Sequence, residues 1–375
     1  MGINKPQVIQ VVNIFFIEGK VQYVKPFGSG HINDTYKVKI SDGSNRQYLL
    51  QRINHHVFPN IEGLMNNMTL VLDHLKEKYE AQKKGSSTRR SLTIVPTRGG
   101  ESYYRDEKGN YWRMFVFLDG TKSYDIVEKK EQARSGGKAF GEFQSLLSDM
   151  DATKLIEVIP NFHNIRFRMD NLRKAIREDK KNRVKDVTDI LNFVMEREEG
   201  MHGILKRGEA GELPLRITHN DTKFNNVLLD KDDNVQCVID LDTVMPGYIA
   251  YDFGDAIRTI INTAAEDELE LEKVRLNIPL YQAYVEGYLS QTKSFLTDNE
   301  IISLLEGVFL LPYMIGVRFL TDYLEGDHYY KVEYPEHNLV RAKTQFKLVQ
   351  EMEMHKNELK DILIEQSLKH EKLNS

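Results

Sequence analysis

The sequence predicts an α+β protein of two lobes, in which a small strand-rich lobe precedes a larger, mainly helical one. At 375 residues the chain is long for a single hydrophobic core. Residues 1–119 are strand-rich in pattern, and apolar and polar residues alternate at 21–27 and 35–40 as in half-buried strands. Over residues 120–375 the apolar positions instead recur three or four apart, as in helices. We therefore expect the lobe boundary at Asp119–Gly120, where one period gives way to the other.

The first lobe should contain five strands and one helix. Residues 41–45 have the composition of a turn, so the strands on either side of them are expected to form a hairpin. The helix follows Pro59 and repeats its apolar residues with a period close to 3.6. The strands are expected at residues 21–27, 35–40, 48–53, 92–95 and 111–118.

The second lobe should be helical except for one strand–loop–strand block at residues 216–242. Helices are expected near residues 130–149, 166–180, 185–207, 265–293, 298–324 and 337–370.

Composition and charge limit the classes of function. A net charge of −5 and a pI near 6.2 argue against general nucleic-acid binding. We see no apolar run approaching the roughly 20 residues of a membrane span, and no signal peptide at the N-terminus. Cys237 is the single cysteine, so no internal disulfide can form and a reducing compartment is favoured. We expect a cytoplasmic protein with no nucleic-acid, membrane or obligate protein partner.

The most informative stretch runs from Ile217 to Asp230. Within it Asp221 and Asn226 have the spacing of D-x-x-x-x-N in the protein-kinase catalytic loop, in which a metal-binding aspartate follows on a later strand. An ionised Asp221 can orient a hydroxyl for attack on the γ-phosphorus and accept its proton. Lys223 can place a positive charge on the γ-phosphate. The alternative is an ordinary polar loop between strands, but Asp240 at the end of the next strand favours the catalytic interpretation.

The same stretch supplies oxygen ligands for Mg²⁺. Asn226 offers an amide oxygen and Asp240 a carboxylate, both of which suit this hard cation. Asp242 is a candidate for a second metal or an outer-shell role, with simple solvation as the alternative. The string Asp252-Phe253-Gly254 matches the metal-binding D-F-G of protein kinases, but it does not follow the catalytic loop by one short strand. We expect Asp252 instead to support the catalytic loop through backbone hydrogen bonds.

The nucleotide is expected to bind in the first lobe. Gly28-Ser29-Gly30 lies between two strands, where glycines allow backbone amides to approach a triphosphate, although an ordinary hairpin turn is the alternative. Arg52, on the third strand, is the candidate cation for the α- and β-phosphates, with an exposed edge-strand arginine as the alternative. Glu62 on the following helix is its candidate partner.

These motifs resemble the aminoglycoside phosphotransferase and choline kinase family. The resemblance covers most of the chain and rests on residues 218–221, 226, 239–242 and 251–252. Within that family the chain is most similar to the N-acetylhexosamine 1-kinases, through residues 28–36, 50–54, 219–223 and 237–247.

The resemblance implies a two-lobed protein-kinase-like fold that uses ATP and Mg²⁺ to phosphorylate N-acetylglucosamine and N-acetylgalactosamine at the anomeric hydroxyl. It also implies that Asp221 contacts the attacking oxygen and that His219 supports the catalytic loop. The sugar ring and its acetamido group would be held by His31, Asn33, Arg318 and Tyr329. For Arg318 the alternative is a buried structural arginine, and for Tyr329 an aromatic residue of the core or rim.

Two other functions compete with a sugar kinase. The acceptor can be an amino alcohol, homoserine or an aminoglycoside; a choline-like cation requires an aromatic and acidic site. The chain can also be a nucleotide-binding pseudokinase that scaffolds partners. The intact set of Asp221, Asn226 and Asp240 favours an enzyme over this second alternative.

Overall fold

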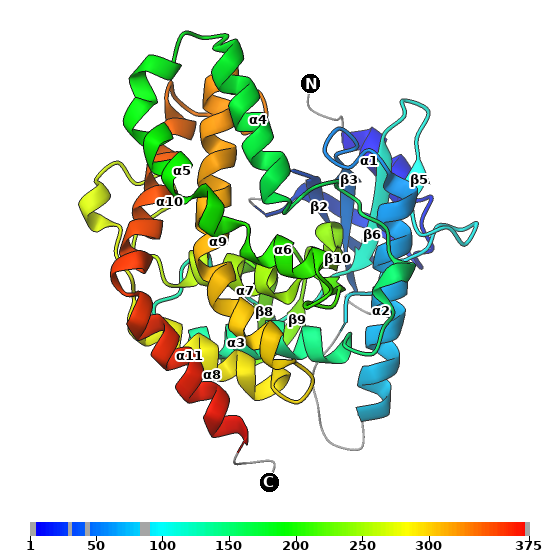
Figure 1. The fold of residues 1–375 in the computed structure, drawn as a ribbon. Coiled ribbons are helices and arrows are strands. Elements are labelled where there is room, and N and C mark those ends of the chain that lie inside the picture. The colour runs from blue at the N-terminus through cyan, green and yellow to red at the C-terminus, as the bar shows by residue number, and fades with distance from the viewer. Residues whose placement is uncertain (1–4, 29–31, 42–45, 83–90, 372–375) are drawn as a thin grey trace. The chain divides into compact units, whose positions relative to one another are not determined.

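The computed structural model describes residues 5–28, 32–41, 46–82 and 91–371, which form two compact units (Figure 1). Unit 1 is drawn from residues 1–122, 153–160 and 228–245, and unit 2 from residues 123–152, 161–227 and 246–375. The lobe boundary at residue 119 rests on periodicity alone and stays a prediction.

Unit 1 is built around a small antiparallel sheet of six strands, which confirms the predicted strand-rich lobe with one strand more than expected. The strand order is β1-β2-β3-β6-β4, and β5 also pairs with β6. The helix α1 and the two-residue strand β5 were not expected. The elements of this unit are α1 (Lys5–Val12), β1 (Lys20–Pro26), β2 (Asp34–Ser41), β3 (Gln47–Ile53), α2 (Ile61–Gln82), β4 (Ile94–Val95), β5 (Tyr104–Arg105), β6 (Tyr111–Val116) and the pair β8 (Val227–Leu229) and β9 (Val235–Val238).

One face of this sheet is covered by α1. Val8, Val11 and Val12 form an apolar stripe on α1 and belong to one buried cluster with Leu50 of β3 and Met114 of β6. Because successive side chains of a strand point to opposite faces, the neighbours of Leu50 and Met114 face away from α1. This alternation places Thr35, Gln51 and Arg113 on the other side of the sheet.

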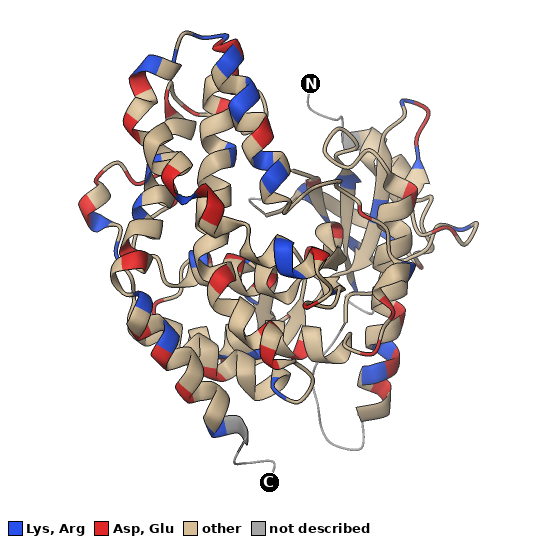
Figure 2. Cartoon of the chain, viewed as in Figure 1, with Lys and Arg blue, Asp and Glu red and all other residues tan. Residues whose placement is uncertain are grey.

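Unit 2 is mainly helical, also as predicted. Besides its helices, this unit contains a short two-stranded sheet, in which β7 pairs with β10. The elements are α3 (Lys130–Leu146), α4 (Ile165–Glu178), α5 (Thr188–Met201), α6 (Gly203–Glu209), β7 (Arg216–Thr218), β10 (Met245–Gly247), α7 (Ile249–Ile260), α8 (Ile278–Thr292), α9 (Asp298–Glu325), α10 (His337–Met354) and α11 (Lys356–Glu371). Basic and acidic residues are scattered together over most of these helices (Figure 2).

Three of the predicted helices have wrong limits. Residues 185–207 and 337–370 are each divided into two helices, near His202 and His355. Residues 265–277 precede a helix instead of forming one. There α8 begins only at Ile278, because the Asn277 side chain accepts a hydrogen bond from the Leu280 N–H and Pro279 occupies the first turn.

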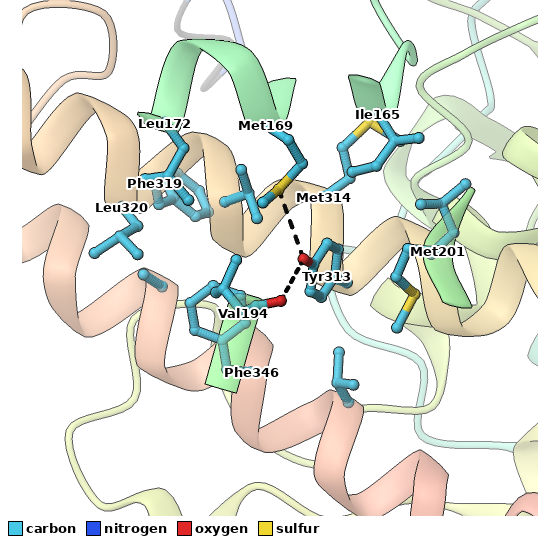
Figure 3. Packing of buried hydrophobic residues seen from close by; sticks show 14 of the residues in the cluster. Ile165, Met169, Leu172, Val194, Met201, Tyr313, Met314, Phe319, Leu320 and Phe346 are labelled. Atoms are coloured by element: carbon cyan, nitrogen blue, oxygen red, sulfur yellow. Dashed lines mark hydrogen bonds between the residues drawn. The ribbon is translucent and has the colours of Figure 1, made fainter. Parts of the chain in front are cut away.

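The core of unit 2 is organised around α9. By length and composition α9 could cross a membrane, although no such run is expected from the sequence. Most of its apolar stretch is buried inside the unit. Tyr313 lies at the centre, where its hydroxyl donates to the Val194 carbonyl at 2.8 Å and lies 3.6 Å from the Met169 sulfur (Figure 3). Residues of α4, α5 and α10 pack around it.

Helices α7 and α9 meet at two glycines. A Cβ atom on Gly254 would lie 2.1 Å from the Gly307 carbonyl oxygen, and one on Gly307 would lie 2.0 Å from the Ala250 carbonyl oxygen. Neither position has space for a side chain. Phe253, which precedes Gly254, is fully buried beside Tyr284. The Asp252-Phe253-Gly254 string is therefore part of a tightly packed helix.

Candidate active site

The loop after β7 turns sharply at Asn220. Asn220 has a φ of +65°, a left-handed conformation that asparagine adopts more readily than most residues. On one side of the turn His219 is fully buried, with its ring edge-on to Phe140 and Phe143 of α3 at 5.9 and 5.8 Å. On the other side Asp221 keeps part of its side chain exposed. The turn thus anchors one residue and presents the next.

Asp252 on α7 binds the backbone of this loop. Its carboxylate accepts hydrogen bonds from the N–H of His219 at 2.8 Å and of Asn220 at 2.7 Å, and from the Gln144 amide at 2.5 Å. Burial raises the pKa of Asp252 to about 6, although His219 and the two backbone N–H groups act to lower it. These are bonds of the kind expected of a residue that supports the loop.

Asp255, one turn further along α7, holds the same loop. It accepts a hydrogen bond from the Thr222 N–H at 3.0 Å and is paired with Arg258 at 2.8 Å. Sequence reasoning missed both Asp255 and Gln144. For Asp255 the signal was present, because residues three apart on a helix share a face and Asp252 had already been assigned to the loop.

Asp221 and Lys223 form an ion pair within the loop. The Lys223 Nζ lies 3.1 Å from the Asp221 Oδ1. Burial acts to raise the pKa of Asp221, but the charges of Lys223 and then His219 outweigh it, so the pKa lies below its usual value. Asp221 in turn raises the pKa of Lys223. Both groups are charged at neutral pH, and the carboxylate is in the form that accepts a proton.

Asn226, in unit 2, and Asp240 each carry an oxygen group of the kind that a hard divalent cation binds. The Asn226 Nδ2 donates to the Asp221 carbonyl at 2.8 Å, so its amide oxygen is directed away from that residue. Asp240, in unit 1, is exposed and has a φ of +61°, a conformation that is strained for a residue with a side chain. Amide and carboxylate oxygens are the ligands that Mg²⁺ prefers. The donor chemistry of these two residues therefore suits the metal that the sequence predicts.

Asp242 is almost fully buried, whereas Asp240 is exposed. Its Oδ2 accepts a hydrogen bond from Asn33 Nδ2 at 2.7 Å, and its Oδ1 is paired with the guanidinium of Arg113. Asn33 is therefore held within unit 1 by Asp242. The metal role of Asp242 and the substrate role of Asn33 stay predictions. Sequence reasoning missed Arg113, although an arginine inside the apolar stretch 111–118 was a visible signal.

The predicted nucleotide-binding residues are only partly described. Gly28 has a φ of +80°, which a glycine adopts without strain. Ser29, Gly30 and His31 lie outside the described residues. Arg52 is paired with Asp34, which stands directly opposite it on β2, so its candidate partner Glu62 was the wrong choice among the described residues.

Arg318 and Tyr329, two predicted substrate residues, line the same cavity in unit 2. The cavity has a volume of about 220 Å³. The Arg318 guanidinium lies over the rings of Phe162, Tyr329 and Tyr330, at 5.1 to 5.8 Å. The residues that line the cavity are Arg168, Asn171, Lys174, Arg318, Thr321, Asp322, Glu325, Tyr329 and Tyr330.

The cavity lining carries more basic than acidic residues, with Arg168, Lys174 and Arg318 against Asp322 and Glu325. Burial and the neighbouring Arg318 lower the pKa of Arg168 to about 10. His163, fully buried nearby, has its pKa lowered to about 3, first by burial and then by Arg318 and Arg168. Neither guanidinium forms an ion pair with a carboxylate in the part of the chain that the structure describes. The Asp322 carboxylate is already occupied by backbone N–H groups of residues 328–330.

Comparisons with known proteins bear on this site. A sequence model of the phosphotransferase enzyme family (APH) matches residues 24–289, more than two thirds of the chain. The fold is similar to that of an aminoglycoside phosphotransferase from Alicyclobacillus acidocaldarius subsp. acidocaldarius DSM 446, with 13% identity, a TM-score of 0.59, and coverage of 99% of this chain and 98% of that one.

Two further structures have the same fold. Choline kinase from Cryptosporidium parvum Iowa II matches with 13% identity and a TM-score of 0.59 over 95% of this chain and 97% of that one. The amicoumacin kinase hAmiN, in complex with AMP-PNP, Ca²⁺ and Ami, matches with 11% identity and a TM-score of 0.57 over 92% of this chain and 93% of that one. At these identities the likeness shows the protein-kinase-like fold.

Proposed function

The chain belongs to the phosphotransferase enzyme family, and from that premise we propose that it transfers the γ-phosphoryl group of ATP to the anomeric hydroxyl of N-acetylglucosamine or N-acetylgalactosamine. The phosphotransferase part of the proposal is supported by the family and by the charged loop around Asp221. The sugar part is supported by the long motifs of the sequence and by the cavity that Arg318 and Tyr329 line.

Each loop residue has a task in this reaction. Asp221 orients the sugar hydroxyl and accepts its proton as the new P–O bond forms. Lys223 offsets negative charge on the phosphoryl oxygens. Asn226 and Asp240 would hold Mg²⁺, which neutralises charge on the phosphates when it is bound. Asp252 and Asp255 keep the loop in place through its backbone N–H groups.

The observation that carries the choice of acceptor is the positive charge of the cavity. Three basic residues of its lining, Arg168, Lys174 and Arg318, outnumber the two acidic ones, Asp322 and Glu325. Since the Asp322 carboxylate is occupied by backbone N–H groups, a cationic acceptor such as choline, ethanolamine or an aminoglycoside would meet a net positive charge. A neutral sugar with carbonyl and hydroxyl oxygens can instead accept hydrogen bonds from these donors. The volume of about 220 Å³ is below the range of about 300–1,000 Å³ typical of drug-sized ligands. A monosaccharide is in keeping with that size.

An acceptor screen tests the proposal. Purified protein with MgATP is offered N-acetylglucosamine, N-acetylgalactosamine, choline, ethanolamine, homoserine and kanamycin, and ADP release is measured for each. We expect turnover on the two N-acetylhexosamines and phosphorus NMR of the product to show an anomeric phosphate. Turnover on a cationic acceptor in preference to both sugars would refute the choice of acceptor. Binding of MgATP without turnover on any acceptor would refute the enzyme itself.

A matched pair of variants separates acceptor binding from general damage. Arg318→Gln removes a guanidinium from the cavity, whereas Arg197→Gln removes one that is paired with Glu353 between α5 and α10. We expect only the first to raise the KM for the sugar. An equal rise in both variants would contradict the assignment of the cavity to the acceptor.

A further inference from the structure

Unit 1 contains a buried ion pair that the proposed chemistry does not use. Arg113 is 1% exposed on β6, and Asp242 is 3% exposed in the short turn Leu241–Thr243. The Arg113 guanidinium is paired with the Asp242 carboxylate and stacks over the Phe115 ring at 5.2 Å. A charge buried to this extent is tolerated only when a partner of opposite sign and further hydrogen bonds replace its lost water.

The pair connects three strands of the sheet. Arg113 Nε donates to the Gln51 Oε1 at 2.9 Å, and Gln51 Nε2 donates to the Thr35 hydroxyl at 3.2 Å. These residues stand opposite one another in the register of β2, β3 and β6, on the face of the sheet away from α1. The guanidinium is therefore fixed by a row of cross-strand contacts.

The Asp242 side of the pair is fixed as well. Asn33, at the start of β2, donates to Asp242 at 2.7 Å and accepts a hydrogen bond from the Asn54 N–H at 3.0 Å. Two residues after Asp242, the Val244 carbonyl accepts a hydrogen bond from Asn67 of α2 at 3.0 Å. The chain from Asp240 to Val244 is thus tied to β2, β6 and α2 at neighbouring points.

We propose that Arg113 and Asp242 form a positioning pair, which fixes the segment bearing Asp240 against the sheet so that Asp240 can bind the metal of the nucleotide complex. In this proposal Asp242 positions the segment instead of binding the metal, since its Oδ2 accepts a hydrogen bond from Asn33 and its Oδ1 is ion-paired with Arg113. The pair acts through Asp240, whose left-handed conformation needs neighbours that hold it. The inference rests on the proposed function only in assuming that the protein binds a metal–nucleotide complex.

The presence of an ion pair between Arg113 and Asp242, where apolar residues could have packed, supports a positioning role. A buried pair contributes little stability beyond that of well-packed apolar residues of the same volume. Its contacts are directional, however, and Arg113 reaches Asp242 and Gln51 with different nitrogens. The geometry is therefore set more narrowly than an apolar contact would set it.

A double-mutant cycle tests the proposal. The variants Arg113→Met, Asp242→Asn and the combination of both are compared with wild type in the affinity for AMP-PNP, with and without Mg²⁺, by isothermal calorimetry. We expect each single change to weaken Mg²⁺-dependent binding about tenfold and the double variant to be no weaker than the worse single variant, because coupled residues are not additive. The KM for the sugar should change less than twofold, which a general loss of structure would not allow.

Two further variants keep the test decisive. Arg197→Met removes another arginine ion pair, the half-buried one with Glu353 in unit 2, and should lower thermal stability without changing nucleotide affinity. If Arg113→Met or Asp242→Asn fails to fold, Asn33→Ala removes one hydrogen bond to Asp242 without leaving a buried charge unpaired, and should weaken the Mg²⁺-dependent binding of AMP-PNP measured without sugar. Unchanged affinity in Asn33→Ala would overturn the proposal.

The possible results separate this inference from the function on which it rests. Additive losses in the double variant would overturn the positioning pair. So would a loss of Mg²⁺-dependent binding in Asp242→Asn with none in Arg113→Met, since that pattern identifies Asp242 as a direct metal ligand. Wild-type protein that binds no AMP-PNP at all would overturn the proposed function and this inference with it. Binding of AMP-PNP by wild type, together with coupled losses in the cycle, would support the pair whichever acceptor is found.

Discussion

Replacing Asp252 by asparagine should remove most of the activity while changing stability at pH 7 very little. The carboxylate accepts hydrogen bonds from the N–H of His219 and Asn220 and from Gln144. In Asp252→Asn one accepting oxygen becomes a donating NH₂ group, so at least one buried donor loses its acceptor. Such a donor costs about 1–3 kcal/mol.

An opposing effect comes from the buried charge. A native pKa of about 6, against an ordinary value of 3.8, corresponds to a penalty of about 3 kcal/mol on the ionised form of Asp252 in the folded protein. The asparagine variant does not carry that penalty. The two effects nearly cancel at pH 7, and the net change in stability should be within about 2 kcal/mol. Activity has no such compensation, since a displacement of Asp221 by about 1 Å costs about 10²-fold in kcat.

The sign of the pH dependence follows from the raised pKa. At pH 4 and below, Asp252 is largely protonated in the folded protein and no charge is buried. Between about pH 4 and 6 the folded state holds its proton more tightly than the unfolded state, so this group lowers wild-type stability as pH rises. Asp252→Asn lacks that loss. Its stability relative to wild type should therefore improve by up to about 3 kcal/mol from pH 4 to pH 7.

Urea unfolding at pH 4 and pH 7, with kcat from ADP release at pH 7, measures both effects. Asp170→Asn is a matched control, because Asp170 is an exposed residue of α4 that pairs with Arg173; it should change neither quantity. The reasoning fails if Asp252→Asn retains more than a third of wild-type kcat. It also fails if the variant loses the same amount of stability at both pH values.

Three other predictions follow from the site and the packing. Asp221→Asn should lower kcat by about 10²–10⁴-fold with little change in nucleotide affinity, and a coupled assay showing nearly full activity would exclude Asp221 as the base. Asp240→Asn should raise the Mg²⁺ concentration for half-maximal activity at least about tenfold. If its Mg²⁺ titration is unchanged and Asp252→Asn loses the Mg²⁺ dependence instead, Asp252 is the metal ligand and the assignment of Asp240 is wrong. Gly254→Ala should destabilise unit 2 by about 3 kcal/mol, because its methyl group would meet the Gly307 carbonyl; a melting temperature equal to that of wild type would show that α7 and α9 can separate at no cost.

The features that the sequence predicts well are local in the chain. The spacing of Asp221 and Asn226 predicts a common loop, and the structure joins them by a hydrogen bond across five positions. The alternation along 21–27 and 35–40 predicts strands, which the structure confirms as β1 and β2, because each side chain's environment is set by its own position in the pleat. The fold class follows from such local patterns. The strand pattern marks the first lobe, and the helical period of three or four residues marks most of the second.

The features that the sequence does not reveal depend on partners far along the chain. Gln144 and Asp252 are 108 positions apart, and Asn33 and Asp242 are 209 apart. Nothing in the neighbourhood of either residue identifies its partner, because only the folded chain brings them together. Arg113 is visible as an anomaly in an apolar strand, but its meaning needs the position of Asp242.

The glycine contact between α7 and α9 has a consequence for how acceptor specificity can change. Eleven positions, close to three helical turns, separate Gly307 from Arg318, so both lie on one side of α9 about 16 Å apart along its axis. The first half of α9 holds α7, which carries Asp252 and Asp255, and the last turns line the cavity. Substitutions at the cavity end of α9 can therefore change which acceptor is phosphorylated without moving α7 and the loop that Asp252 and Asp255 hold. A library of variants for new acceptors is best confined to that end.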